Sequence, residues 1–270
     1  MFIVIVLQYM FIQRLRGKRM TFPLYIQWYK QQAIKYAIIS HTHNREMMVI
    51  SKHTPNRTTR MLKCHKTQHF DLIWKLMLNT EYFKTWYSVY YSLAEYKRGI
   101  PNQEMCMIRD NKSWDKLHCR DMIHYTHVID IDADTNELKY ALESAILVVL
   151  KLGDCDVYFS GRGFHIYPKI DITGSFMPED NDNIYKKHYQ IAYDLHHTLS
   201  EQVDTSIYDS RRVIKCPFTL AIYPDDDNLY ICKPVPDLKK FDIKDYILTE
   251  ENFKDNVALA KDYSMRRFRK

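Results

Sequence analysis

The chain has 270 residues, 46% of them hydrophobic and 27% charged, which is the composition of an ordinary globular protein with room for one large domain or two small ones. Its six cysteines are scattered singly, so we expect a reduced, intracellular protein rather than one built on a disulfide framework. The formal net charge of +6 suits a polyanionic partner, although by itself it fits a merely soluble basic protein better.

The N-terminal segment, residues 1–19, is a hydrophobic and basic extension. Residues 2–12 are apolar, and cations follow at Arg14, Arg16, Lys18 and Arg19. A bilayer span needs about 20 apolar residues, and a signal peptide places its charge before the apolar run. We therefore favour a segment that packs on the domain, or one upstream of a true start at Met20, over a membrane anchor.

The first half of the remaining chain predicts helices and strands in alternation. Residues 21–39 and 69–79 have helical spacing of apolar residues, whereas residues 44–51 and 85–93 are typical of strands, with a partner strand at 60–63. A polar connector covers residues 98–121.

An acidic strand follows at residues 127–134. Side chains two apart in a strand face the same side, so Asp130 and Asp132 share one face and Ile129 and Ile131 the other. Two neighbouring, partly buried carboxylates repel each other unless a cation lies between them, and hard divalent ions such as Mg²⁺ prefer oxygen ligands. By itself an acid-x-acid strand is weak evidence for a metal site.

A helix and a glycine-containing hairpin come next. Residues 136–152 carry an apolar helical stripe, and Gly153 is the expected C-cap. Residues 158–167 then predict strand, turn and strand, in which Gly161 and Gly163 allow a sharp turn with exposed N–H groups. Arg162 in that turn has the fork geometry of a phosphate ligand, and His165 faces the same side as Tyr167.

The C-terminal third supplies a further carboxylate and more cations. A helix is predicted over 181–200, a cationic strand over 211–220, a strand over 228–235, and a helical tail from 243 onward that ends in cations. We read that basic tail as a solvated end rather than a partner contact. Asp204 precedes the cationic strand and could close the metal site from a neighbouring strand.

Together these parts predict phosphoryl-transfer chemistry. Three carboxylates could hold two metal ions, one activating a 3′-hydroxyl and the other stabilising a pyrophosphate leaving group. Cations at Arg162, His165, Arg212 and Lys215 would hold a nucleoside triphosphate. A metal-dependent nuclease would use similar residues, but it has no triphosphate to hold, so we favour a nucleotidyltransferase.

The three motifs, in this order, resemble those of the catalytic small subunit of archaeal and eukaryotic primases, within the primase-polymerase superfamily. Val128-Ile129-Asp130-Ile131-Asp132 is similar to the family's acidic strand and Ser160–His165 to its Ser-Gly-Arg-Gly-aromatic-His element. Asp204 with the stretch from Arg212 to Phe218 is similar to the third Asp and its cationic strand. Weaker flanking likenesses, such as Asn44-Arg45-Glu46, extend the resemblance over roughly residues 20–262.

The resemblance implies a mixed α/β (α+β) primase catalytic domain over residues 20–270, with an RRM-like sheet at about 125–235. It implies template-directed synthesis of short primers from nucleoside triphosphates on single-stranded DNA, with Mg²⁺ or Mn²⁺ as cofactor. Its implied site residues are metal ligands and nucleotide contacts; the metal ligands are Asp130, Asp132 and Asp204, and the nucleotide contacts are Ser160, Gly161, Arg162, His165, Arg212 and Lys215.

Two departures from the family pattern affect the expected partners. Residues 166–203 contain no cysteine, and His118, Cys119, His124 and His127 lack zinc spacing, so we expect no structural zinc. Ala221 follows Pro217-Phe218-Thr219-Leu220 where the family often has a histidine, so a phosphate contact is missing or comes from Tyr223. Both leave open whether a primase large subunit is a partner.

The alternatives are a gap-filling repair polymerase of the same superfamily and a non-catalytic RRM-like nucleic-acid-binding module. Carboxylates at Asp130 and Asp132 would repel a nucleic-acid backbone in the absence of metal, which argues against the second alternative. We expect an intracellular location in the cytoplasm or nucleoid, or in a nucleus or viral factory for a eukaryotic or viral chain, and no membrane partner.

Overall fold

A computed structural model describes residues 23–42, 45–51, 59–61, 74–75, 87–96, 122–133, 137–169, 181–208, 212–223 and 226–268. The N-terminal extension 1–19, the connector 98–121 and most of the helix predicted at 69–79 lie outside the described residues. Within them, the chain mixes α-helices and β-strands, as predicted, and the sheets are antiparallel.

The first sheet is built from strands of the N-terminal half and one late strand. Its order is β2 (Thr59–Met61), β1 (Arg45–Ser51), β3 (Tyr87–Tyr96) and β4 (Met122–Tyr125), and β8 (Val213–Lys215) also pairs with β3. All these pairings are antiparallel. The pairing of β8 matters for the site, because it brings the predicted cationic strand, and Lys215 with it, into the middle of the molecule.

The second sheet carries the acidic strand and the hairpin. Its order is β5 (Ile129–Ile131), β7 (Phe164–Pro168) and β6 (Cys155–Phe159), again antiparallel. Helix α7 (Leu138–Leu152) connects β5 to β6, and α8 (Asn181–Thr198) follows β7. Gly153 ends α7 as predicted, at a φ of 85° with its N–H donating to the Val149 carbonyl over 2.8 Å.

The C-terminal part is less regular than the sequence predicts. After β9 (Leu220–Tyr223) and β10 (Asp226–Ile231) the chain forms two 3₁₀ turns, η2 (Leu238–Lys240) and η3 (Ile243–Tyr246), before α9 (Phe253–Phe268). The strand predicted to run to residue 235 ends at Ile231, ahead of Pro234 and Pro236, which lack the N–H that a ladder needs. The helix predicted from residue 243 begins only at Phe253.

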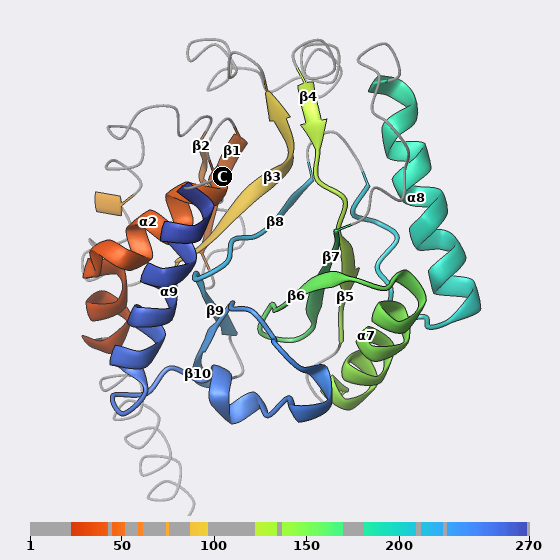
Figure 1. The fold of residues 1–270 in the computed structure, drawn as a ribbon. Coiled ribbons are helices and arrows are strands. Elements are labelled where there is room, and N and C mark those ends of the chain that lie inside the picture. Colours follow the sequence, from red (N-terminus) through yellow and green to blue (C-terminus); the bar gives the residue numbers. More distant parts are fainter. Residues whose placement is uncertain are drawn as a thin grey trace, which may run out of the picture.

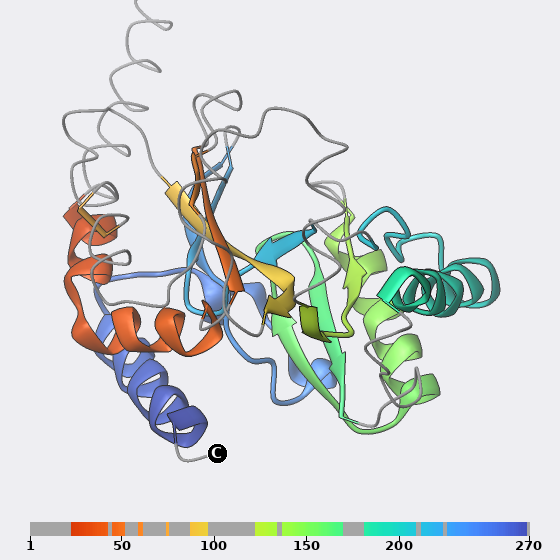
Figure 2. The ribbon, with the colours of Figure 1, turned by 90° about the horizontal axis from the view of Figure 1, so that it is seen from above.

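The elements form layers that Figures 1 and 2 show from two directions. Helices α2 (Gln32–Thr42) and α9 lie together on one side, the two sheets occupy the middle, and α7 and α8 lie on the other side. Aromatic side chains of the helical residues 23–30 fill the core, and Trp28 donates from its indole nitrogen to the Phe218 carbonyl over 3.0 Å. The N-terminal helices are thereby attached to the turn that follows β8.

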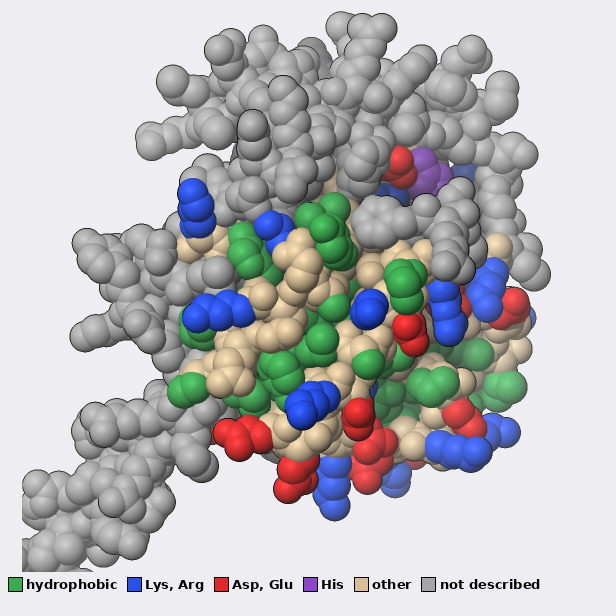
Figure 3. Space-filling model, turned by 60° about the vertical axis from the view of Figure 1, so that its left-hand side comes forward, with side chains coloured by type: hydrophobic (Ala, Val, Ile, Leu, Met, Phe, Trp, Pro, Cys, Tyr) green, Lys and Arg blue, Asp and Glu red, His purple; other side chains and the backbone are tan. Residues whose placement is uncertain are grey.

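The described surface gives two further observations. No helix among the described residues is long and apolar enough to cross a membrane. On the face where α2 and α9 come forward, acidic and basic side chains are interspersed along the lower edge in Figure 3. The net positive charge is therefore not gathered into one basic patch on the described part of that face.

Candidate active site

The acidic strand and the hairpin face each other through backbone pairing. In β5, Asp130 lies between the buried residues Ile129 and Ile131, and its partner across the β5–β7 ladder is His165. Directly opposed residues of an antiparallel pair project from the same face. The imidazole Nε2 of His165 accordingly lies 3.6 Å from Oδ1 of Asp130, close but too far for a hydrogen bond.

The third carboxylate arrives on the free edge of β5. Val203 forms an antiparallel bridge with Ile131, flanked by hydrogen bonds from the Asp204 N–H to the Asp130 carbonyl (2.9 Å) and from the Asp132 N–H to the Gln202 carbonyl (3.1 Å). This register sets Asp204 opposite Asp130. One carboxylate oxygen from each of Asp130, Asp132 and Asp204 lies within 4.8 Å of the other two, so these residues, here called the Asp triad, could hold a metal ion.

The electrostatics of the Asp triad suit a bound cation. Burial, and next the carboxylates of Asp132 and Asp204, raise the pKa of Asp130 well above its ordinary value, while Lys215 and Arg212 act in the opposite direction. Oδ1 of Asp130 is buried and has no hydrogen-bond partner among the described residues. Clustered carboxylate oxygens are the ligand type that Mg²⁺ and Mn²⁺ prefer, so the residues fit the expected cofactor.

Close packing explains both glycines of the hairpin, against backbone atoms at Gly163 and against side chains at Gly161. A Cβ at position 163 would lie 1.7 Å from the Ile131 carbonyl oxygen, which no rearrangement of a side chain could relieve. Gly161 has a φ of 109°, and a Cβ there would lie 2.5 Å from that of Ala221. The hairpin turn therefore lies directly over the end of β5, with the Ser160 N–H donating to the Gly163 carbonyl over 2.9 Å.

An open pocket of about 510 Å³ adjoins the Asp triad, a volume within the range of small-molecule sites. Its lining combines acids, cations and an aromatic ring, from Asp132, Ala133, Glu137, Arg162, Gln202, Lys215 and Tyr223. The guanidinium of Arg162 lies over the Tyr223 ring, 3.8 Å from its centroid. The ammonium of Lys215 donates to the Ser160 carbonyl (2.6 Å) and the Tyr223 hydroxyl (3.2 Å), which fixes it at the pocket wall.

The remaining predicted site residues occupy different positions around this pocket. Ser160 is buried and contributes its carbonyl to Lys215, whereas Arg212 donates to the Ser206 carbonyl in the loop after Asp204. His165 is buried too, and that burial, followed by the charge of Lys215, lowers its pKa to about 3. His165 is therefore neutral near pH 7, rather than the cation that the sequence analysis counted with Arg162, Arg212 and Lys215.

Sequence reasoning missed two polar residues of the pocket, Gln202 and Glu137, besides the small Ala133. Gln202 lies two residues before Asp204 on the same extended segment, so strand alternation could have placed it on the site face. Glu137 immediately precedes α7, and no local pattern marks it. Tyr223, which the sequence offered as a substitute for a missing histidine, does line the pocket.

A separate histidine contact lies near the acidic strand. The rings of His127 and His188 stack with centroids 4.3 Å apart, their Nδ1 atoms in contact, and Tyr208 stacks on both. The partner of His127 comes from α8 and was not predicted; His118 and Cys119 lie outside the described residues. Among the described residues, the Asp triad is the one group whose ligand atoms lie close enough together to hold a metal ion.

Comparison of the sequence with models of known protein families gives no match, and comparison with curated proteins gives none either.

Proposed function

We propose that the protein is a primase, a DNA-directed nucleotidyltransferase that synthesises short primers from nucleoside triphosphates during DNA replication. The observation that carries the proposal is the register of the 202–204 segment on β5, which joins Asp204 to Asp130 and Asp132 beside a pocket lined by cations. A nucleotidyltransferase needs carboxylates for a divalent ion and, next to them, cations for a triphosphate, whereas a nuclease needs the carboxylates but has no triphosphate to bind.

The strand order supports the RRM-like part of the proposal. The chain runs β5, α7, β6, β7, α8 and then the Val203 segment, a β-α-β-β-α-β sequence of elements. In space, the Val203 segment, β5, β7 and β6 lie in that order, all antiparallel. We propose that this unit is the RRM-like catalytic sheet of a primase domain. It carries the Asp triad where an RNA-binding RRM sheet carries aromatic side chains that stack on bases.

In this proposal Asp130, Asp132 and Asp204 hold Mg²⁺ or Mn²⁺. When bound, the ion would supply Lewis-acid activation of a 3′-hydroxyl and neutralise charge on the phosphates. Arg162 and Lys215 would contact the triphosphate, and the Tyr223 ring keeps the Arg162 guanidinium directed along the pocket wall. Neutral His165 can donate one hydrogen bond to a phosphate oxygen without adding charge beside Asp130.

The remaining nucleotide contacts in this proposal are structural in part. Gly161 and Ser160 form the turn that sets Arg162 at the pocket, and the Ser160 carbonyl orients Lys215. Arg212 ties the loop after Asp204 to the start of β8 and offsets charge on Asp130. Its loss would therefore act on the geometry of the Asp triad as well as on the nucleotide.

A primer-free assay tests the function. Purified protein is incubated with single-stranded DNA, labelled nucleoside triphosphates and Mg²⁺ or Mn²⁺, beside the double variant Asp130→Ala with Asp132→Ala. A variant with Asp255→Ala and Asp262→Ala removes two exposed carboxylates of α9 and serves as the matched control. We expect short products from the wild type and the control variant, and none from the double variant.

The other outcomes separate the alternatives. Products that form only when a primer is supplied would favour the gap-filling repair polymerase. No product in either assay would refute a self-sufficient enzyme, and a nucleotide-binding titration would then separate a catalytic chain that needs a large subunit from a non-catalytic nucleic-acid-binding module. Full activity of the double variant would refute the metal assignment.

A further inference from the structure

The pocket beside the Asp triad has two parts of different charge. In the first part Arg162, Lys215 and Tyr223 contact one another: the Arg162 guanidinium lies 3.8 Å from the centroid of the Tyr223 ring, and Nζ of Lys215 lies 3.2 Å from its hydroxyl. The other described lining residues besides Asp132 carry no cation, and they are Ala133, Glu137 and Gln202. A triphosphate is attracted to the first part, which leaves the second for the sugar and base of a nucleotide.

These two parts lie on opposite edges of β5. The hairpin that carries Arg162 leads into β7 on one edge, and the segment before Asp204 lies on the other. The Asp132 N–H donates to the Gln202 carbonyl over 3.1 Å, so Gln202 lies opposite Asp132, and opposed residues of an antiparallel pair project from the same face. A nucleotide whose phosphates lie at Arg162 and the Asp triad can therefore extend across the end of β5 toward Gln202 and Glu137.

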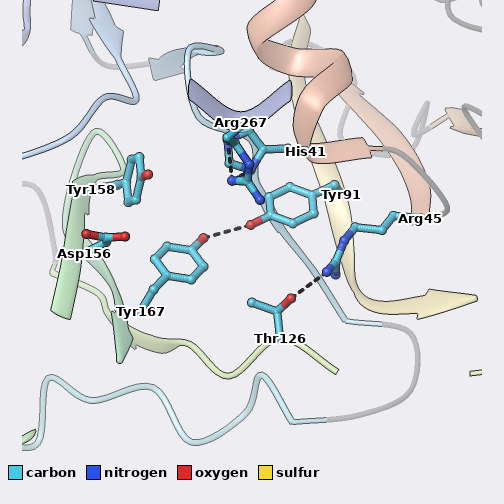
Figure 4. A pocket seen from close by; sticks show the side chains of 8 residues that line it. All are labelled: His41, Arg45, Tyr91, Thr126, Asp156, Tyr158, Tyr167 and Arg267. Carbon is cyan, nitrogen blue, oxygen red and sulfur yellow. Dashed lines mark hydrogen bonds between the residues drawn. The ribbon is translucent and has the colours of Figure 1, made fainter. Parts of the chain in front are cut away.

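A second pocket of the described structure is too small for the sugar and base. Its volume is about 180 Å³, whereas small-molecule sites occupy about 300–1,000 Å³. Figure 4 shows its side chains directed toward one another: the hydroxyls of Tyr91 and Tyr167 lie 3.1 Å apart, and Arg45 donates to the Thr126 hydroxyl over 2.7 Å. These polar groups are hydrogen-bonded to each other, so the larger pocket beside the Asp triad is the better place for a nucleoside.

Glu137 brings a carboxylate to that larger pocket. It holds the N-cap position of α7, but its side chain makes no capping hydrogen bond. No hydrogen bond or ion pair joins its carboxylate to another described residue, and it does not belong to the group of oxygens that lie within 4.8 Å of one another in the Asp triad. The side chain is half-buried and lines the pocket. Helix capping, charge pairing and the metal site therefore do not account for this carboxylate.

The chemistry of a carboxylate at this position favours a hydroxyl group as its partner. A carboxylate has acceptors and no donor, so it repels phosphate oxygens and accepts hydrogen bonds from O–H groups, about twice as strongly as a neutral acceptor does. The sugar of a ribonucleotide offers such donors, and an acidic residue binds the ribose 2′-hydroxyl in dinucleotide-binding folds. Gln202 is neutral, so it does not compete for Glu137 as an ion-pair partner.

We propose that Glu137 accepts a hydrogen bond from the 2′-hydroxyl of the incoming nucleotide and thereby selects ribonucleotides over deoxyribonucleotides. The proposal rests on the function proposed above, because it takes the ligand of the pocket to be a nucleoside triphosphate. The Asp triad and the cations Arg162 and Lys215 meet phosphates that both kinds of nucleotide share. Glu137 is the lining residue that meets the difference between them.

Nucleotide binding tests the proposal without relying on activity. The affinities of the full chain for ATP, 2′-deoxy-ATP and 3′-deoxy-ATP are measured by calorimetry with Mn²⁺ and without template. The variants are Glu137→Ala and Glu137→Gln, which remove no capping hydrogen bond from α7. The matched control is Glu143→Ala, which removes an exposed carboxylate of the same helix that lies 3.8 Å from Lys139. Binding of Mn²⁺ alone is measured for each protein.

We expect wild type and Glu143→Ala to bind ATP about tenfold more tightly than 2′-deoxy-ATP, the difference typical of a hydrogen bond to a charged group. The ratio of the two affinities should fall to about one in Glu137→Ala, and to about threefold in Glu137→Gln, which keeps a neutral acceptor. The ratio is the readout because removing a negative charge also changes the affinity for both triphosphates. Wild type should bind 3′-deoxy-ATP as it binds ATP.

The proposal is overturned if the wild type shows no preference for ATP, if the preference survives in Glu137→Ala, or if it follows the 3′-hydroxyl instead. It is overturned as well if Glu137→Ala weakens binding of Mn²⁺ alone, because the carboxylate would then be a metal ligand. Primer synthesis is measured separately. A preference that depends on Glu137 in a chain that makes no primer would refute the proposed function and support the sugar contact, and primer synthesis with an unchanged preference would do the reverse.

Discussion

Replacing Asp130 with asparagine should make the metal-free protein more stable, because asparagine keeps the shape of the side chain and removes its charge. In the wild type that charge is buried beside Asp204 and Asp132, and Oδ1 has no hydrogen-bond partner among the described residues. Removing a carboxylate that stabilises the fold lowers the free energy of unfolding. A carboxylate that binds a metal ion instead destabilises the metal-free protein, so its removal raises that free energy. The sign of the effect therefore separates the two roles.

The magnitude follows from the distances in the Asp triad. Two unit charges 4.8 Å apart repel by about 3.5 kcal/mol at an effective dielectric constant of about 20. Asp132 contributes more of this repulsion than Asp204, solvent screens part of it because Asp132 is exposed, and the attraction of Lys215 and Arg212 offsets some of the rest. We expect the free energy of unfolding to rise by about 1–2 kcal/mol in the variant near pH 7.5.

Urea denaturation followed by tryptophan fluorescence, first with EDTA and then with Mn²⁺, measures both parts of the effect. With EDTA the variant should be the more stable protein. With Mn²⁺ at about 100 times its dissociation constant, the wild type should gain about 2.7 kcal/mol and the variant little, which reverses the order. Asp262→Asn, which removes an exposed carboxylate of α9, should follow the wild type under both conditions.

A loss of more than about 1 kcal/mol in the variant with EDTA would refute the reasoning, since the charge of Asp130 would then be held by favourable interactions in the fold. Equal stabilisation of both proteins by Mn²⁺ would place the ion elsewhere.

Three further predictions concern the hairpin, a buried histidine and the pocket. Gly163→Ala should lower the free energy of unfolding by about 3 kcal/mol or more, because its Cβ would overlap a backbone oxygen. Gly153→Ala has no atom within 4 Å of its Cβ and should lower the free energy of unfolding by only about 1–2 kcal/mol, from its positive φ. Urea denaturation of both variants measures the difference. Burial, and next the charges of His127 and His124, lower the pKa of His188 in the folded protein to about 2. As the pH falls below about 6.5, the unfolded chain therefore binds a proton at His188 that the folded protein does not bind. The free energy of unfolding decreases as the pH falls in that range. His188→Gln should remove about 1.4 kcal/mol from the loss of stability between pH 7.5 and pH 5.5, and His197→Gln, on the exposed side of the same helix, should leave that loss unchanged. Arg162→Ala should raise the KM for nucleotide about tenfold or more in the primer-free assay with a smaller change in template affinity, and the opposite pattern would contradict its assignment to the triphosphate.

Local pattern was enough to predict the elements that carry the site. Alternation of side chains predicted which face of its own strand Asp130 occupies in residues 129–131, and likewise His165 in residues 164–168. Helical spacing, with Gly153 at the end, predicted the last residue of α7. A strand at 44–51 with a partner at 60–63 was predicted as well, and the structure pairs β1 (Arg45–Ser51) with β2 (Thr59–Met61), a contact of short sequence separation. These features depend on side-chain periods of 2 and 3.6 residues, which any local stretch displays.

Charge states and pairings over long distances required the tertiary structure. His165 was counted as a cation because its burial, which keeps it neutral, comes from residues on other strands. The basic tail was read as solvated, yet Arg267 hydrogen-bonds to His41, 226 residues earlier. Neither contact follows from the sequence around the residue concerned.

The sequence by itself determined which residues could do chemistry: three aspartates, a glycine-flanked arginine and a lysine at the end of a short strand. The tertiary structure decided that they meet, through the one-residue register in which Val203 pairs with Ile131 and sets Asp204 opposite Asp130. It also decided that Glu137 and Gln202 line the pocket beside the Asp triad. The physical reason is that a strand specifies its own two faces locally, whereas its register and its neighbours are set by packing of the whole core.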